Sequence, residues 1–403
     1  MIDTVSHRFA VLFAACLPPV GVMAPKGSVV LLLALGLVGA VRWVQEGRPR
    51  LPVDRRIAFA LAALALWAAA TATWAFAPAG ALVLVLKLMG VSAAGVAALS
   101  VVARLDVGQR RTVENALFAG MGLGIAALAV GFAYATVTGE ALWSTFKSDP
   151  LATLNTGAVA MGLLAWPAFA ALWRRGHRLP AGIGATVLYA GLWFLSSAAA
   201  LLAPVVGVTG FFVVWFLGRR GALALAAVVA VLAVAAPQIA SWGLSPEKIG
   251  TPPPPSLSSV EHRIRIWAFT TEKIDEKPVL GWGMDASRAV PGGHQELAPG
   301  TEILPLHPHN AFLQVRLELG LPGAAIIAAL LGVFFAVVVG GMNDRLGRAV
   351  AAGTGVAFLT VASISYGIWQ NWWIAFAWSL AALTALTVGP SAPAGGREAA
   401  SGP

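Results

Sequence analysis

Two histidines stand one residue apart in the segment His307-Pro308-His309-Asn310. A histidine side chain gains and loses a proton near neutral pH, so it can act as an acid or a base. Asn310 is a preferred first residue of a helix, and residues 311–319 have helical character. The free N–H groups at the start of a helix attract anions such as phosphate. The segment therefore predicts a place where a proton moves beside a bound anion.

A second group of candidate residues lies earlier in the chain, on a predicted helix. Ser258, followed three residues later by a glutamate, has the spacing of a capping box, and Pro278 ends the helix. Arg263 and Trp267 share one face of that helix, whereas Arg265 points about 200° away from Arg263. Because a guanidinium can hold a diphosphate through two parallel hydrogen bonds, Arg263 is a candidate for binding an anion.

These polar residues also have simpler interpretations. His307 and His309 could be interfacial histidines without a chemical role, or they could bind a metal ion. Because the surrounding segment has no second motif with the spacing of metal ligands, no metal site is predicted. Arg263 could pair with Glu261 or Asp275 instead of a ligand.

The aromatic residues and glycines nearby leave similar alternatives. Trp267 and Trp282 could be anchors or core residues, or platforms on which a sugar ring stacks. Gly281 and Gly283 flank Trp282 and predict a tight turn in which the backbone can approach a ligand or another helix.

The composition shows where these groups must be held. Of the 403 residues, 58% are hydrophobic and only 11% are charged, and the mean hydropathy is +0.78. Soluble domains have roughly 25% charged residues, so a single soluble core is excluded. One cysteine, Cys16, excludes a disulfide scaffold. The sequence predicts an all-α integral membrane protein.

Twelve segments are long and apolar enough to cross a bilayer. We expect them at 9–24, 28–44, 57–76, 79–103, 113–136, 154–173, 180–197, 199–218, 221–240, 322–341, 349–367 and 372–388. Four regions follow: helices one to nine in residues 1–240, a large and partly helical loop at 241–321, helices ten to twelve in 322–390, and a disordered tail at 391–403. Of the 27 lysines and arginines, 17 lie near helix ends on the same side of the membrane, and all 17 are arginines.

This bias predicts that both chain ends are cytoplasmic and that the large loop faces the periplasm of a bacterial inner membrane. The net charge of +9 is then mainly a topology signal, and no nucleic-acid partner is expected. Because the large loop is the one long polar segment, the functional groups should gather there.

The two motif groups together resemble the shared domain of the O-antigen ligase and polymerase superfamily. The resemblance covers HRIRIWAFTTEKIDEKPVLGWGMDASRAVPGG (262–293) and LPLHPHNAFLQVRLELGLPGA (304–324). The family pattern is Arg-x-x-x-Trp, Pro-x-x-Gly-x-Gly, His-Asn-x-x-Leu, Glu-x-Gly and a further Gly. It falls here on Arg263, Trp267, Pro278, Gly281, Gly283, His309, Asn310, Leu313, Glu318, Gly320 and Gly323. Twelve spans with one late periplasmic loop extend the likeness to the whole chain.

The resemblance implies a glycosyltransferase of the GT-C-like integral-membrane class. The donor would be a glycan on undecaprenyl diphosphate, and the acceptor a sugar hydroxyl of the lipid A core. The reaction would invert the anomeric carbon without a metal or another cofactor. Membrane lipids would be the other partners, and we expect a monomer or a weak homo-oligomer.

The resemblance also implies roles for individual residues. His309 would activate the acceptor hydroxyl as general base, and Arg263 would stabilise the leaving diphosphate. Glu318 would orient His309 or Arg316, and Asn310 would cap the helix end that faces the phosphates. Further candidates for substrate binding are Arg265, Arg288, His307, Arg316, Lys87 and Trp267.

One departure from the family pattern concerns a second cation. Ligases of the family often carry a Ser-Arg pair at the periplasmic start of a middle helix, and the matching place here reads Ser196-Ser197-Ala198. Either Lys87, Arg263, Arg265 or Arg288 supplies that charge, or the chain is from a different branch. Lys87 lies within the fourth span, where a lysine is either functional or snorkels to the interface.

Two other functions remain open at this point. One is an O-antigen or exopolysaccharide polymerase of the same superfamily. The other is a transporter or flippase of polar or lipid-linked substrates, which twelve spans would suit. A transporter, however, binds its substrate near the bilayer midplane, whereas the polar residues here cluster outside the membrane.

Overall fold

The structure is a computed structural model that describes residues 2–143, 150–195, 197–243 and 259–388. The expectations for Ser196, Ser258 and the tail 391–403 lie outside these residues. Within them the chain is almost entirely helical, and its one sheet is a hairpin of two short strands, β1 (Glu296–Ala298) and β2 (Thr301–Glu302).

In the part of the chain that the structure describes, twelve helical segments are long and apolar enough to cross a membrane, as predicted. The helices are α1 (Ile2–Met23), α2 (Ser28–Gln45), α3 (Arg55–Thr71), α4 (Pro78–Ala103), α5 (Val107–Thr138), α6 (Asn155–Arg174), α7 (Arg178–Leu192), α8 (Ala198–Leu217), α9 (Arg219–Gly243), α11 (Ala311–Val333), α12 (Arg345–Ile364) and α13 (Asn371–Val388). A further helix, α10 (Ser259–Glu276), is too polar to be among them. The all-α, multi-span membrane fold is therefore confirmed.

The tenth span is predicted at 322–341, after a helix at 311–319. α11 is assigned as one helix from Ala311 to Val333, and the π-helix Phe334–Val339 follows it. Gly320 has non-helical backbone angles, φ 64° and ψ −157°, so α11 consists of two helices that meet at a kink. The break at Gly320 separates residues 311–319 from the remainder of the span, as the sequence predicts.

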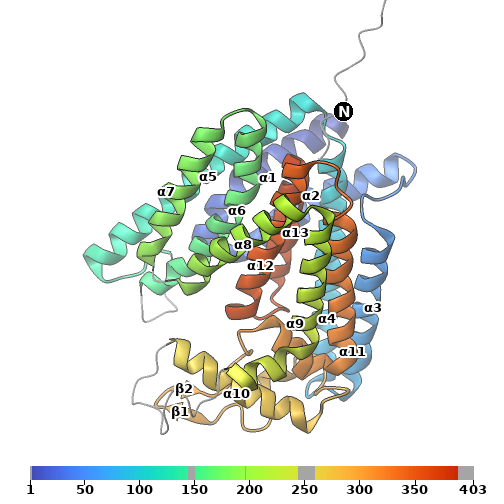
Figure 1. Ribbon diagram of the computed structural model, residues 1–403, viewed down its shortest axis with the longest axis vertical. Coiled ribbons are helices and arrows are strands. Elements are labelled where there is room, and N and C mark those ends of the chain that lie inside the picture. Colours follow the sequence, from blue (N-terminus) through green and yellow to red (C-terminus); the bar gives the residue numbers. More distant parts are fainter. Residues whose placement is uncertain (1, 144–149, 196, 244–258, 389–403) are drawn as a thin grey trace, which may run out of the picture.

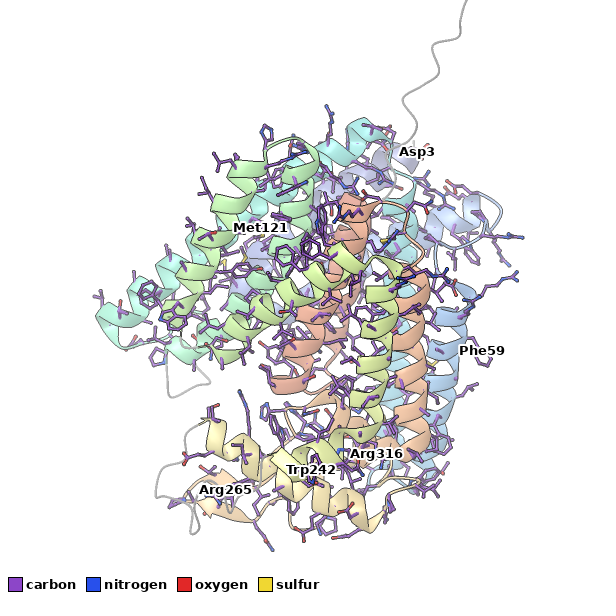
Figure 2. All side chains as sticks on the ribbon, in the orientation of Figure 1. Asp3, Phe59, Met121, Trp242, Arg265 and Arg316 are labelled. Carbon is purple, nitrogen blue, oxygen red and sulfur yellow. The ribbon has the colours of Figure 1, made fainter. Side chains whose placement is uncertain are left out.

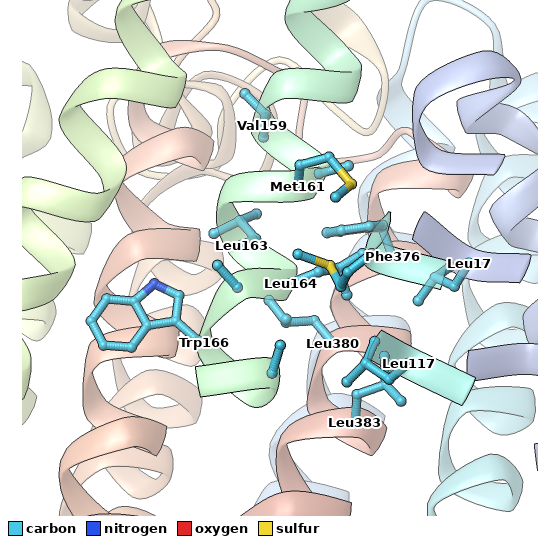
Figure 3. Close-up of a cluster of buried hydrophobic side chains, with 14 of the residues drawn as sticks. Leu17, Leu117, Val159, Met161, Leu163, Leu164, Trp166, Phe376, Leu380 and Leu383 are labelled. Carbon is cyan, nitrogen blue, oxygen red and sulfur yellow. The ribbon is translucent and has the colours of Figure 1, made fainter. Parts of the chain in front are cut away.

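α6 runs through the centre of one half of the bundle (Figure 3). Its residues Met161 and Leu164 are fully buried, and they pack in one cluster with Leu17 of α1, Leu117 of α5 and Leu383 of α13. A second cluster joins α3, α4, α9 and α11 to α10 and to the loop that follows it. The large loop therefore lies beneath α3, α4, α9 and α11 and shares this second core with them (Figure 1).

Arginines that pair with acidic side chains lie at the end of the bundle that carries Asp3, which is opposite Arg265 of the large loop (Figure 2). Arg42 of α2 pairs with Asp3 and Glu46, each at 2.6 Å. Arg175, at the end of α6, pairs with Glu114 at 2.6 Å. The two ends of the molecule therefore differ in chemistry: one carries paired arginines, and the other carries the histidines of the large loop.

Candidate functional site

The glycine motifs fasten the large loop to the kink of α11. The backbone N–H of Trp282 donates to the carbonyl of Leu317 at 2.8 Å, and that of Gly283 donates to the carbonyl of Glu318 at 2.9 Å. A Cβ on Gly281 would lie 2.6 Å from the Gly320 nitrogen. The backbone therefore approaches another helix at this turn and leaves no room for a ligand between them.

Glu318 is fully buried and holds three segments together. One carboxylate oxygen accepts the N–H of Asp285 at 2.8 Å and the indole N–H of Trp369 at 2.7 Å. The other accepts the Ser287 hydroxyl and, at 3.0 Å, the amide of Gln314. The expectation that Glu318 orients His309 or Arg316 is therefore wrong, because these donors occupy both of its oxygens.

Arg316 and Arg265 are both buried within the protein. Arg316 is 6% exposed and donates to the carbonyl of Pro278 at 3.2 Å, which ties α11 to the end of α10. Arg265 is also 6% exposed and lies on the side of α10 turned away from Arg263, as the helical spacing predicts. A role of either arginine in substrate binding stays a prediction.

His309 lies on the connection between the hairpin and α11, in a left-handed backbone conformation with φ 54°. This conformation is costly for a residue with a side chain and is common at functional sites. The next residue, Asn310, caps α11 as predicted, because its side chain accepts the N–H groups of Phe312 at 3.0 Å and Leu313 at 3.1 Å. The cap fixes the first turn of α11 and thereby the position of His309, which directly precedes Asn310.

The protonation of His309 follows from its partner. Nδ1 contacts the carbonyl oxygen of Ser365, which can only accept, so Nδ1 carries the proton. Nε2 then has a free lone pair, and it is not among the buried unpartnered atoms of the described residues. Burial lowers the pKa of His309, and the charges of Arg263 and His262 add to that effect. His309 is therefore a neutral imidazole whose basic nitrogen is accessible.

His307 packs beside His309, with 4.3 Å between the ring centroids. Its Nδ1 accepts the backbone N–H of His309 at 3.2 Å, so its proton lies on Nε2. Nε2 of His307 lies 3.2 Å from the side-chain amide nitrogen of Gln370, and the opposite orientation of that amide would let its oxygen accept the proton. Burial lowers the pKa of His307 to about 3. His307 acts as a neutral support for His309.

Arg263 is half-buried, and its charge acts on His309. Among the described residues, its guanidinium has no hydrogen-bond or ion-pair partner, so the expected alternative of pairing with Glu261 or Asp275 is not found. Burial lowers the pKa of Arg263, and its charge acts on His309 and on Tyr366. An unpaired guanidinium beside a neutral imidazole is suited to an anionic ligand.

Trp267 and Trp282 both have structural contacts. The indole N–H of Trp267 donates to the carbonyl of Pro308 at 2.8 Å, and this bond joins α10 to the histidine segment. Trp282 is 9% exposed, donates to the carbonyl of Lys273 at 2.7 Å and stacks on Phe76. Trp267 therefore positions the histidines, and Trp282 belongs to the core beneath the loop.

The remaining predicted cations lie differently. Arg288 is exposed and pairs with Asp285 at 2.9 Å, while its charge contributes to the lowered pKa of His307. Lys87 is exposed on the outer surface of α4, and the structure gives it no contact with the histidine site. No group of three His, Cys, Asp or Glu side chains that could hold a metal ion is found in the part of the chain that the structure describes.

Sequence reasoning missed the connection 365–370 between α12 and α13, which closes the site from the other side. Its residues supply the Ser365 carbonyl to His309, the Gln370 amide to His307 and the Trp369 indole to Glu318. The backbone N–H of Ile368 donates to Gln314 at 2.9 Å. A signal was present, because SYGIWQN interrupts the last two apolar spans with a tyrosine, a glutamine and an asparagine.

The fold and the site together define a multi-pass membrane protein with a histidine–arginine site at one end of its helix bundle. Residues 183–328 match the family described as O-antigen ligase. This match confirms the resemblance to the O-antigen ligase and polymerase superfamily, and it contains Arg263, His309 and Glu318. It does not reach the connection 365–370.

Proteins of three Rickettsia species with "polysaccharide ligase" in their names are also similar to the chain. The Rickettsia conorii protein is 30% identical over 242 residues, which are 57% of this chain and 56% of the relative. The Rickettsia prowazekii protein is 29% identical over 235 residues, 55% of each chain, and the Rickettsia felis protein is 30% identical over 246 residues, 58% of each. The chain thus spans about half the length of the relatives that it matches.

Proposed function

We propose that the protein is an O-antigen ligase-type glycosyltransferase. It transfers a glycan from undecaprenyl diphosphate to a sugar hydroxyl of the lipid A core, and it works at the periplasmic face of a bacterial inner membrane. One observation carries this proposal. His309 is neutral with an accessible Nε2, and it is within the influence of the charge of Arg263, which has no ion-pair partner among the described residues. The O-antigen ligase match over residues 183–328 and the names of the relatives support it.

The chemistry would use both groups in one displacement. Nε2 of His309 takes the proton of the acceptor hydroxyl, and the acceptor oxygen attacks the anomeric carbon from the face opposite the diphosphate. A new glycosidic bond forms while the bond to the diphosphate oxygen breaks, which inverts the anomeric carbon. The electron pair of the broken bond leaves with the diphosphate, whose charge Arg263 stabilises.

The position of the site favours transfer over transport. Arg263 lies on α10, and the two histidines lie between β2 and α11. α10 and the β1–β2 hairpin are at one end of the bundle rather than midway along the helices (Figure 1). Lys87, a charge placed within a span, is exposed on the outer surface and does not line a path between the helices. A transporter would instead need polar groups that converge near the midplane.

The proposal is tested in a strain that lacks its own copy of the gene. Cells that produce His309→Ala should show bare lipid A core on a lipopolysaccharide gel and should accumulate long glycan on the lipid carrier. His177→Ala, a histidine at the arginine-rich end, is the matched control and should restore normal lipopolysaccharide. Core that carries a single repeat would indicate a polymerase instead. Normal lipopolysaccharide from an inserted His309→Ala protein would contradict the proposal.

A further inference from the structure

Gln314 lies in the first turn of α11, and only 3% of it is exposed. Its side-chain amide nitrogen donates to Oε1 of Glu318 at 3.0 Å, and its amide oxygen accepts the backbone N–H of Ile368 at 2.9 Å. A carboxylate oxygen accepts and a backbone N–H donates, so both neighbours require the same orientation of the amide. Gln314 therefore joins the buried carboxylate of α11 to the main chain of the connection 365–370.

This bond fixes the backbone that contacts His309. Ile368 follows Ser365 by three residues, and the carbonyl of Ser365 accepts the Nδ1 proton of His309. Glu318 also binds the connection, but it does so through the indole of Trp369, a side chain that can turn while the backbone stays in place. The Gln314 bond to Ile368 is made to the main chain itself, so it acts directly on the position of the Ser365 carbonyl.

The same connection packs against the other histidine without a gap. A Cβ on Gly367 would lie 2.8 Å from Cγ and Cδ2 of His307, which is too close for any side chain larger than hydrogen. Nδ1 of His307 in turn accepts the backbone N–H of His309 at 3.2 Å. A displacement of the connection would therefore change the contacts of both histidines.

We propose that Gln314 is a positioning residue for the general base: it holds the connection 365–370 where the Ser365 carbonyl keeps the proton of His309 on Nδ1. Nε2 then remains free to take the proton of the acceptor hydroxyl. Gln314 acts through Ser365 and not on the substrate. The inference rests on the proposed function for the role of His309 in transfer. The O-antigen ligase match over residues 183–328 includes Gln314 but not Ser365.

The test reads the tautomer of His309 directly. Nitrogen NMR of the full-length protein in detergent, made with isotope-labelled histidine, reports which ring nitrogen carries the proton, and His309→Gln identifies the signal by its loss. Gln314→Met keeps the length of the side chain and removes both hydrogen bonds. We expect a smaller fraction of the Nδ1–H tautomer and a kcat for transfer that is about 10-fold lower at unchanged KM, as for the loss of one hydrogen bond to a group that gains charge.

Thr354→Val is the matched control. The Thr354 hydroxyl is buried and donates to the carbonyl of Val350 at 2.8 Å within α12, so valine removes a buried hydrogen bond that does not lead to the connection. It should leave both the His309 tautomer and kcat unchanged. If Gln314→Met lowers Tm and kcat but keeps the tautomer of the unaltered protein, Gln314 only supports the fold, and the inference is overturned.

Gly367→Ala is the second variant, should Gln314→Met fail to fold. It removes no hydrogen-bonding group and directs a methyl group into the ring of His307, so it should shift the His309 tautomer in the same direction. An unchanged tautomer in this variant would overturn the inference as well. If the unaltered protein transfers no glycan while the tautomer still shifts in Gln314→Met, the proposed function fails and the positioning of His309 by Gln314 stands.

Discussion

Nδ1 of His309 donates to the backbone carbonyl of Ser365, across a separation of 56 residues in the sequence. A carbonyl cannot donate, so this bond selects the tautomer and leaves Nε2 basic. The bond also joins the connection before α11 to the connection after α12, because each of the two residues lies in one of them. The candidate base is therefore set by a backbone atom from a distant part of the chain.

The pH dependence of transfer should follow this histidine. His309 acts as a base only when neutral, so activity falls as the pH drops through its pKa. Burial and the nearby charges of Arg263 and His262 lower that pKa, and the acid limb should therefore lie below the ordinary histidine value of 6.5. His307, with a pKa of about 3, stays neutral across this range. A pH–rate profile of the purified protein checks the limb, and a midpoint above 6.5 would contradict it.

Replacing His309 should lower kcat far more than removing a structural contact would. General base catalysis typically contributes about 10²–10⁴-fold, so His309→Ala should lower kcat by that order. His309→Gln is the informative second variant, because it keeps a polar side chain of similar length but has no basic nitrogen. Single-turnover transfer with a lipid-linked donor measures the effect. Full activity in the glutamine variant would show that His309 only holds the fold.

Arg263 should tolerate lysine poorly. Lysine keeps the charge but cannot offer two parallel donors to a diphosphate, so Arg263→Lys should lower kcat/KM, and Arg263→Gln should lower it further. The expected loss for the glutamine variant is on the order of 10²-fold, as for one donor aimed at developing charge. Arg220→Gln, an exposed arginine at the opposite end, is the control and should transfer normally. Equal activity of Arg263→Gln and the control would exclude a role in leaving-group stabilisation.

Sequence patterns predicted the helices well because hydropathy and length decide which segments span a bilayer. They also placed Arg263, Trp267 and Asn310 correctly, since those relationships lie within one helix turn or one cap. Contacts between distant segments were beyond such patterns. Nothing local in the sequence states that Ser365 meets His309, or that Gln370 meets His307.

Glu318 shows the same limit in another form. Its place in the Glu-x-Gly motif suggested an orienting role toward neighbours in the sequence. The carboxylate instead accepts donors from Asp285, Ser287 and Trp369, which lie 31 to 51 positions away. The motif identifies Glu318 as important for the fold, but only the tertiary structure shows which donors its carboxylate accepts.

Glu318→Gln should therefore act on stability first. All contacts of the carboxylate in the described structure are with donors, so a glutamine amide would place N–H groups against N–H or O–H groups. Leaving buried donors unsatisfied costs about 1–3 kcal/mol each. We expect a lower Tm in a detergent-based unfolding assay and an unchanged acid limb in the pH profile. An unchanged Tm with a shifted acid limb would instead support a direct effect of Glu318 on His309.

Gly320→Ala tests whether the backbone clasp between the loop and α11 holds the site together. Gly320 has φ 64°, and a Cβ there would overlap the carbonyl of Val279 and crowd the nitrogen of Gly281. Strain of this kind costs of order 1–3 kcal/mol before the overlap is added, so the variant should lower both Tm and transfer activity. Gly332→Ala is the control on the same helix, because its Cβ would meet nothing within 4 Å. If Gly320→Ala matched this control in Tm and in activity, the close approach of the two glycine motifs would not hold the loop to α11.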